Sequence, residues 1–447
     1  MCKGKLGVLL TAGLLVCSLV AVSFPAIADT TIRVIAMEYP NSHSEVEIKG
    51  EFEEMTGIKV EYTFYPWEGA TDKLKVEIAT KSSTYDIYYV DALMRAVFNP
   101  LDGFEPLNKY IDDPNLPDLN VKTIVPGLIE LYETHKGQIV GIPCYACNRV
   151  YAYRKDLFSD PGEKAAFREK YGYDLLPPDT WDQYRDICEF FTRDTNGDGK
   201  IDFWGTAKGF AGEGPAWDEL ADVYESFYPI KDGRYWIDNE YKPIFNNPKA
   251  YQALQFMVDL VQSGFVSPGH MKKSWGDAPE DFSAGKTAMT NMFYDVYPDV
   301  EKSPVGGKVG YFPVPKFEIH HTRFSSMDYS INKYSKNKVA AYKYLAWVFS
   351  DENDVRKAVA TEAHGLPMRT PSFYEPEVIA MMPYLLTAMR QWPDQIPWPR
   401  FAEFEEMYRI VSVAVQNALM GKQTPKEALD LAAQELYEVM ERAGYYR

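Results

Sequence analysis

The residues best suited to metal chemistry form an alternating run of oxygen-bearing side chains. Asp194, Asn196 and Asp198 take the first, third and fifth positions of this run, Gly199 the sixth and Asp202 the ninth. This spacing matches the front of an EF-hand calcium loop. The twelfth position is a glycine, where a bidentate glutamate is expected. We therefore predict a weakly held structural calcium, and the alternative is a glycine-rich Asx turn. No other cofactor is required.

A second group of side chains is suited to binding hydroxyl groups. Glu38 and Tyr39 follow the first predicted strand, Trp67 the second and Asp91 the third. Ligands bind beyond the carboxyl ends of parallel strands, where carboxylates accept from hydroxyls and a ring stacks on the apolar face of a sugar. We predict that these four residues contact a ligand. The alternatives are local core packing for Trp67, and helix-capping or solvated carboxylates for Glu38 and Asp91.

The common catalytic motifs are missing from the sequence. It has no Gly-x-Ser-x-Gly elbow, no His-Glu-x-x-His helix and no phosphate-cradling glycine loop, and its six histidines are scattered. We therefore predict a protein that is not an enzyme. A secreted glycoside hydrolase stays open as an alternative, because it needs only two carboxylates placed across a sugar.

Three cysteines follow the N-terminal segment. Cys144 and Cys147 form a Cys-x-x-Cys pair, and Cys188 stands alone. In an extended segment the first two Cα atoms would lie about 10 Å apart, too far for a disulfide. We expect ordinary thiols, with a disulfide elsewhere as the alternative, and no redox chemistry.

The N-terminus has the organisation of a secretory signal peptide. Lys3 and Lys5 precede an apolar run over residues 6–22, and Ala26-Ile27-Ala28 gives a small-x-small cleavage site. We predict a signal peptide over residues 1–28 and a periplasmic or extracellular protein. Because the bulky Val16 precedes Cys17, a lipid anchor is not expected. An uncleaved anchor is the alternative.

The chain is strongly acidic. Its net charge is −17, and removing residues 1–28 takes away two lysines and no acids, which gives −19. Such a charge disfavours binding to nucleic acid or to an anionic membrane. We expect neither partner, and we expect a monomer.

The predicted elements alternate between strands and helices. Strands at 32–37, 58–65 and 87–90 are separated by two helices, the first of which stops at Gly57. This order predicts a mostly parallel, doubly wound sheet. A second α/β region begins near Cys147, and capping boxes at Thr180 and Thr424 open later helices. No flexible linker separates the two regions, which predicts a hinge between them.

Several segments, taken in order, resemble the extracellular solute-binding proteins of the sugar-binding, maltose-binding-protein-like type. The segments that carry the resemblance include "TGIKVEYTFYPW" (56–67), "HKGQIVGIPCYACNRVYAYRKDLFSD" (135–160), "PPDTWDQYRDICEFFT" (177–192), "DFSAGKTAMTNM" (281–292), "VGYFPVPK" (309–316) and "HGLPMRTPSF" (364–373). Each motif alone is weak, whereas their order and spacing together are specific.

The resemblance implies two α/β lobes, each a mostly parallel sheet flanked by helices, joined by crossing strands at a hinge. The first lobe would comprise residues 29–144 and 294–362, and the second 145–293 and 363–447. Crossings are expected at 143–146, 291–294 and 362–366. A carbohydrate ligand, a mono- or disaccharide or a polyol, would be held between the lobes and delivered to the permease subunits of an ABC importer. A sensor subunit that presents its ligand to a receptor is an alternative.

The resemblance also implies further ligand contacts. Tyr145 follows the crossing proline, Trp217 follows a glycine-rich segment, and Arg369 follows Leu366-Pro367. Arg369 would bind a hydroxyl or a carboxylate, or otherwise pair with an acid. Tyr294 stands where the family often has Gly-Pro-Trp, so the chain departs from the pattern there. Asp328 replaces a small residue, and we expect it to project into the cleft and favour a small ligand.

Overall fold

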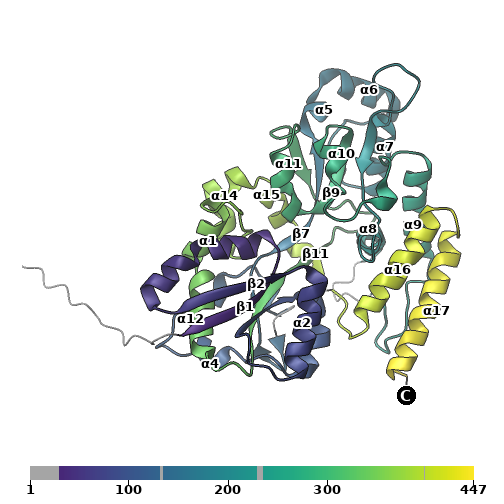
Figure 1. Ribbon diagram of the computed structural model, residues 1–447. Helices are drawn as coiled ribbons and strands as arrows, with labels where there is room; N and C mark the ends of the chain where they lie inside the picture. The colour runs from purple at the N-terminus through teal and green to yellow at the C-terminus, as the bar shows by residue number, and fades with distance from the viewer. Residues whose placement is uncertain (1–29, 131–133, 229–234, 397, 447) are drawn as a thin grey trace, which may run out of the picture.

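The computed structural model describes residues 30–130, 134–228, 235–396 and 398–446 (Figure 1). The predicted signal peptide therefore lies outside the described residues. The chain forms two α/β lobes, each built on its own sheet, which confirms the predicted fold class. None of the helices within these ranges combines the length and apolar character needed to cross a bilayer.

The first lobe is built on a five-stranded sheet. In spatial order its strands are β2 (Lys59–Tyr65), β1 (Thr31–Met37), β3 (Ile87–Asp91), β12 (Met327–Ile331) and β6 (Ile142–Pro143). β1 runs parallel to β2 and β3, whereas β12 runs antiparallel to both of its neighbours. The three parallel strands thus direct their carboxyl ends toward one edge of the sheet.

Helices cover this sheet. They are α1 (Pro40–Thr56), α2 (Trp67–Ala79), α3 (Arg95–Phe98), α4 (Asn108–Ile111), α12 (Lys338–Val348) and α13 (Asp351–Val359). α1 stops where the sequence predicts, because Gly57 takes a left-handed φ of 72° and its N–H bonds to the Glu53 carbonyl at 2.9 Å. α12 and α13 both pack against α1, which brings distant parts of the chain into one lobe.

The second lobe has a mixed sheet. Its strands run β13 (Gln395–Ile396), β11 (Thr322–Ser325), β7 (Cys147–Arg154), β9 (Thr287–Phe293) and β8 (Trp204–Ala207), and β10 (Val309–Phe312) also pairs with β7. The central strand β7 is antiparallel to β9, β10 and β11. The prediction of a mostly parallel second sheet is therefore wrong, because β9, β10 and β11 each run in the direction opposite to β7.

The remaining helices accompany the second sheet or connect it to the first lobe. They are α5 (Lys155–Ser159), α6 (Pro161–Tyr171), α7 (Trp181–Phe191), α8 (Pro215–Tyr224), α9 (Pro248–Gln262), α10 (Glu280–Ser283), α11 (Tyr297–Glu301), α14 (Pro376–Met381), α15 (Leu385–Arg390), α16 (Phe404–Leu419) and α17 (Pro425–Ala443). α14 makes such a connection through its contact with α13. Both predicted capping boxes, at Thr180 and Thr424, are formed. α16 packs against both α8 and α17, and α17 forms the outer edge of the molecule in Figure 1.

The lobes are joined by chain crossings that lie side by side. The Cys144 N–H donates to the Met327 carbonyl at 2.8 Å, and the Ala146 N–H donates to the Pro367 carbonyl at 3.2 Å. The side-chain amide of Asn41 donates to the carbonyls of Cys144 and Leu366, at 3.2 and 3.0 Å. These bonds tie the start of α1 to two crossings and build a compact hinge.

The structure corrects the predicted boundaries. β10 and β11 pair with β7, so residues 309–325 belong to the second lobe. The chain returns to the first lobe only at β12, which pairs with β3. The crossing predicted at 291–294 is wrong, because β9 stays in the second sheet through Phe293. The actual crossing lies between Ser325 and Met327. All three described cysteines are buried, free thiols.

Candidate ligand-binding site

The first lobe presents two predicted carboxylates at its strand ends. Asp91, the last residue of β3, is buried, and its Oδ1 accepts from the Leu93 N–H at 2.9 Å. Glu38, just beyond β1, is exposed and lies 2.9 Å from His43 Nε2. A ligand contact by either residue stays a prediction. Asp91 is the better candidate, because its carboxylate is buried at the strand end whereas that of Glu38 is exposed to solvent.

Tyr39 joins the two lobes. Its ring stacks on Tyr145 with 5.4 Å between centroids, and its hydroxyl donates to the Asp295 carboxylate, which follows β9. Burial raises the pKa of Asp295 to about 6. Among the described residues, no donor reaches the buried Oδ1 of Asp295. Tyr39 and Tyr145 therefore contact each other where the lobes meet, and a ligand contact by either residue stays a prediction.

The second lobe presents an acid held by two aromatic residues. Asp218 of α8 accepts from Trp275 Nε1 at 2.7 Å and from the Tyr408 hydroxyl at 2.9 Å, and both donors reach the same oxygen, Oδ2. The two rings are nearly parallel, 17° apart in plane. Trp275 is 39% exposed, so its ring is open to a ligand. We call Trp275 and Tyr408 the ring pair.

A glycine seats the ring pair. A Cβ added to Gly214, which precedes α8, would lie 2.2 Å from Trp275 Cζ2 and 2.4 Å from Tyr408 Cε1. Atoms cannot approach that closely, so only glycine lets both rings rest on the backbone here. The orientation of the ring pair is thus fixed by packing on Gly214 and by the bonds to Asp218.

Electrostatics connect the two faces. Burial raises the pKa of Tyr408 well above its usual value, the charge of Asp218 adds to this, and so does the charge of Asp91 from the first lobe. Asp91 and Tyr408 therefore lie within electrostatic reach of each other. We use "lobe junction" for the region defined by Tyr39, Asp91, Asp218, Trp275, Asp295 and Tyr408.

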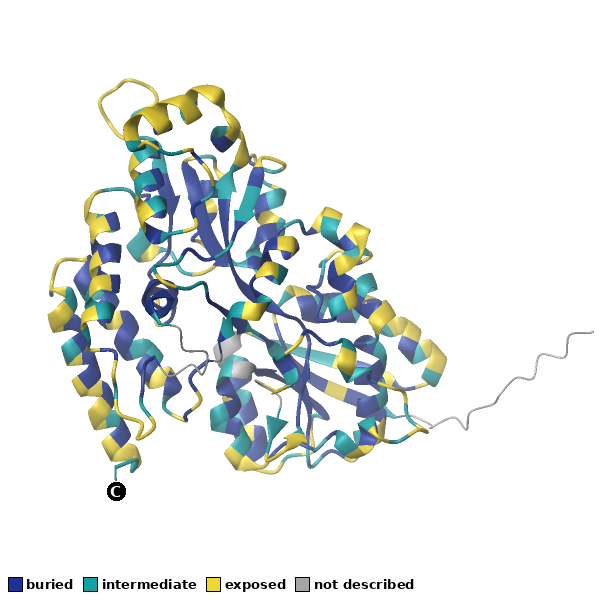
Figure 2. Cartoon of the chain, turned by 180° about the vertical axis from the view of Figure 1, so that it is seen from behind, coloured by how far each residue is buried: buried dark blue, intermediate teal, exposed yellow. Residues whose placement is uncertain are grey.

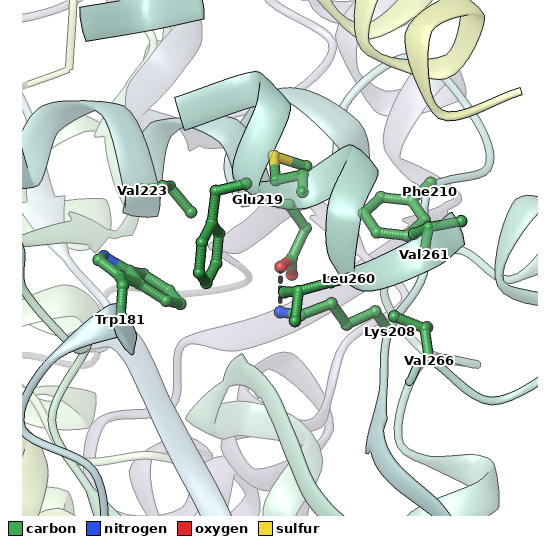
Figure 3. Close-up of a pocket in the computed structure, with 10 residues that line it drawn as sticks. Trp181, Lys208, Phe210, Glu219, Val223, Leu260, Val261 and Val266 are labelled. Atoms are coloured by element: carbon green, nitrogen blue, oxygen red, sulfur yellow. Dashed lines mark hydrogen bonds and ion pairs between the residues drawn. The ribbon is translucent and has the colours of Figure 1, made fainter. Parts of the chain in front are cut away.

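The helix that carries Asp218 is buried along its whole length, as Figure 2 shows. Its other acids are paired with basic residues of the same lobe: Arg149 Nη2 lies 2.5 Å from Glu219 Oε1, Arg149 Nε lies 2.7 Å from Asp222 Oδ2, and Lys208 Nζ lies 2.6 Å from Glu219 Oε2. Figure 3 shows Lys208 and Glu219 pointing toward each other beside a cavity of about 10 Å³. A cavity of that size holds about one water, so it is not the ligand site.

Trp217 does not form a ligand wall. It is fully buried on α8, with its ring 5.3 Å from that of Trp398 and 4.8 Å from that of Trp236. Because every residue of α8 is buried, the structure favours a core role for Trp217 over the predicted ligand contact. Trp275 of the same lobe, by contrast, is 39% exposed.

Three other predicted contacts are engaged inside the protein. Tyr294 is buried and donates to the Ala146 carbonyl at the hinge. Asp328 does not project outward, because it is buried in an ion pair with Arg95. Arg369 donates to the carbonyls of Leu119 and Phe349, both at 2.6 Å, and is fully buried. These contacts favour structural roles for all three residues.

The predicted calcium loop is closed by its own hydrogen bonds. Asp194 accepts from the N–H groups of Asn196, Gly197 and Gly199 at 3.1, 2.7 and 2.7 Å, and Asp202 accepts from the Thr195 N–H at 2.7 Å. Within the described ranges, no three His, Cys, Asp or Glu side chains are grouped so as to hold a metal. Calcium binding by Asp194, Asn196, Asp198 and Asp202 stays a prediction.

Trp67, Asp218, Tyr408 and Trp275 remain to be placed. The side chain of Trp67 is outside the described residues, although α2 begins at Trp67. Asp218 and Tyr408 were missed, because their sequence surroundings read as ordinary helix. Trp275 lies in a turn, outside any helix or strand, and no periodic pattern marks it.

Comparison with known proteins gives a family and a fold. The family model described as "Bacterial extracellular solute-binding protein" matches residues 41–355. A mannitol-binding protein of Pseudomonas aeruginosa is 23% identical over 83% of this chain and 84% of its own length. A probable amino-acid ABC transporter periplasmic-binding protein of Sinorhizobium fredii is 22% identical over 93% of this chain and 90% of its own.

Solved structures share the fold. An ABC transporter solute-binding protein of Agrobacterium radiobacter in complex with ribitol superposes with a TM-score of 0.76 at 21% identity, covering 92% of this chain and 99% of that one. Maltose-bound MalE3 of T. maritima superposes with a TM-score of 0.75 at 24% identity, covering 92% of this chain and all (100%) of that one.

Proposed function

Because the chain belongs to the bacterial extracellular solute-binding protein family, we propose that it captures a neutral sugar or polyol between its lobes. In this proposal the ligand is passed unaltered to the permease subunits of an ABC importer. Family members and structural relatives are binding proteins rather than enzymes.

The observation that carries this proposal is the exposed ring of Trp275, which donates to the Asp218 carboxylate in the second lobe, together with the buried Asp91 at the end of β3 in the first lobe. An indole face suits the C–H face of a sugar or polyol, and carboxylates accept hydrogen bonds from its hydroxyls. Rings and acids on both faces of one junction would hold a ligand from two sides. A ligand held from both sides would bind the closed conformation best, and would therefore shift the equilibrium from the open to the closed conformation.

The charge of the site supports a neutral ligand over an anionic one. Arg149 is paired with Glu219 and Asp222, and Lys208 with Glu219. Arg369 is paired with Asp351 and with backbone carbonyls. A ligand carboxylate would have to displace these partners. The relatives named for mannitol, ribitol and maltose support the same choice, whereas the relative named for amino acids represents the competing class.

The predicted signal peptide supports a location outside the cytoplasm, in the periplasm or at the cell surface. We propose that the mature protein works there as a monomer. A sensor subunit would share the same fold and site, and would differ only in the membrane partner that receives the loaded protein.

Thermal unfolding against a panel tests the proposal. The panel holds ribitol, D-mannitol, D-tagatose, maltose and several amino acids. A ligand that binds only the folded state raises the melting temperature, by an amount set by its concentration relative to Kd. We expect a shift with at least one sugar or polyol, and recovery of that compound intact by mass spectrometry. Shifts with amino acids alone, or catalytic amounts of cleaved sugar, would overturn the proposal.

A further inference from the structure

The Asp218 carboxylate has two oxygens in different situations. Oδ2 accepts both hydrogen bonds of the ring pair, from Trp275 at 2.7 Å and from Tyr408 at 2.9 Å. Among the described residues, no hydrogen-bond donor reaches Oδ1, and Asp218 is 2% exposed. Oδ2 therefore holds the two rings in place, and Oδ1 is available to accept a hydrogen bond from a ligand.

We propose, on the basis of the proposed function, that Asp218 Oδ1 accepts a hydroxyl of the ligand more strongly while Asp218 is ionised, so that a proton on Oδ1 weakens ligand binding. A proton arriving at Asp218 goes to Oδ1, because two hydrogen bonds already lower the basicity of Oδ2. Protonation then replaces a charged acceptor with a neutral hydroxyl. Hydrogen bonds to charged groups are the stronger kind, so capture weakens.

The surroundings of Asp218 set the pH at which this happens. Burial raises the pKa of Asp218 to about 7, and Asp222, one turn further along α8, raises it as well. Opposing them, Arg149 of β7 and the donors Trp275 and Tyr408 stabilise the ionised form.

The neighbouring charges are already committed to partners. Glu219 is held by Arg149 and Lys208, and Asp222 by Arg149 and by the Tyr151 hydroxyl at 2.9 Å. Across the lobe junction, the charge of Asp91 acts on Tyr408. Asp218 is thus the acid of α8 that combines a raised pKa near neutrality with bonds to the exposed ring pair.

The ligand affinity should accordingly depend on pH. Because the ligand prefers the ionised form, affinity rises with pH through about 7 and levels off above it. We expect binding to be about tenfold weaker at pH 5.5 than at pH 8.5, the effect of one charge-assisted hydrogen bond. Binding at pH 6.5 should also release a fraction of a proton, which calorimetry detects as a heat that changes with the buffer.

The experiment is a calorimetric titration between pH 5.5 and 8.5 with the best-binding member of ribitol, D-mannitol, D-tagatose and maltose. Asp218→Asn should bind weakly with a flat pH profile. The matched control is Glu45→Gln, since burial also raises the pKa of Glu45 to about 7 but its carboxylate bonds to the Tyr329 and Tyr62 hydroxyls within the first lobe; it should keep the pH dependence. A flat wild-type profile, a sloping Asp218→Asn profile or a flat Glu45→Gln profile would each overturn the inference.

A second variant covers the case in which Asp218→Asn does not fold. Tyr408→Phe removes one hydrogen bond that lowers the pKa of Asp218, so the midpoint of the pH profile should move upward. An unchanged midpoint would show that another group titrates. Failure of the whole panel to bind at any pH would defeat the proposed function, whereas binding that ignores pH would defeat only this inference.

Discussion

The two lobes build their sides of the lobe junction from different kinds of structure. In the first lobe, Tyr39 and Asp91 stand at the ends of neighbouring parallel strands. In the second, Asp218 comes from a buried helix, Trp275 from a loop 57 residues later, and Tyr408 from a helix 190 residues later. In the first lobe, the topology of the parallel sheet alone brings the two residues to one edge. In the second lobe, Asp218, Trp275 and Tyr408 meet only when their separate elements pack together. The following predictions test this contrast.

The largest expected effect separates the two tryptophans of the second lobe. Trp217→Ala removes a fully buried ring and should lower the free energy of unfolding by about 3–5 kcal/mol. Trp275→Ala removes a partly exposed ring and should cost about 1 kcal/mol or less. Urea unfolding at constant pH measures both. Equal losses would show that the assignment of core and ligand wall is incorrect.

The second effect concerns ligand affinity. Trp275→Ala should weaken the binding of the preferred sugar or polyol by about 2 kcal/mol, roughly 30-fold, because the ligand loses its stacking surface. Tyr374→Ala is the matched control, since Tyr374 is 63% exposed and lies outside the lobe junction. Calorimetric titration of both variants decides the matter, and a similar loss in the control would count against a specific ring contact.

The third effect is the pH dependence of stability caused by Glu45, a buried acid of the first lobe. Burial raises the pKa of Glu45 to about 7, so the folded protein holds a proton that the unfolded chain has lost. The stability from this group is present below about pH 4.5 and declines as pH rises through 7. Glu45→Gln should remove about 2–3 kcal/mol of that decline in unfolding experiments between pH 4.5 and 7.

The same variant sharpens the comparison between Glu45 and Asp218. Glu45 bonds to the Tyr329 and Tyr62 hydroxyls, at 2.6 and 3.1 Å, within the first lobe. Glu45→Gln should therefore keep the pH profile of ligand binding, which Asp218→Asn flattens. A flattened profile in Glu45→Gln would mean that the two lobes are not independent in this respect.

The smallest effect distinguishes the two strand-end acids of the first lobe. Asp91→Asn should weaken ligand binding by about tenfold, the loss of one charge-assisted hydrogen bond. Glu38→Gln should change it by less than about twofold, because Glu38 is exposed beside His43. Titrations of the two variants under identical conditions give the ratio, and a reversed order would place the ligand nearer α1 than the end of β3.

The sequence predicts the first lobe better than the second for a physical reason. The alternation of strands and helices over residues 31–91 determines which side chains share an edge, so local patterns predict that Tyr39 and Asp91 stand at one edge of the sheet; their contact with a ligand stays a prediction. α8 instead carries acids that look solvent-exposed in sequence. Glu219 and Asp222 are buried because Arg149 of β7 and Lys208 reach them from other elements, and no local pattern shows this.

The same limit explains the wrong boundaries and site residues. Residues 309–325 read as strands in either lobe, and only pairing with β7 assigns them to the second. Asp328 and Arg369 were predicted as ligand contacts from their place in the chain. Each is engaged by a distant partner, Arg95 and the Leu119 carbonyl respectively. Long-range partners of charged residues are the part of this fold that sequence patterns do not contain.

Small-angle scattering of the protein with and without the best-binding sugar or polyol tests the central claim, capture between two lobes. The account predicts a smaller radius of gyration at saturation in the wild type, and no change in Trp275→Ala at the same ligand concentration. An identical scattering profile for the free and the saturated wild type would contradict it.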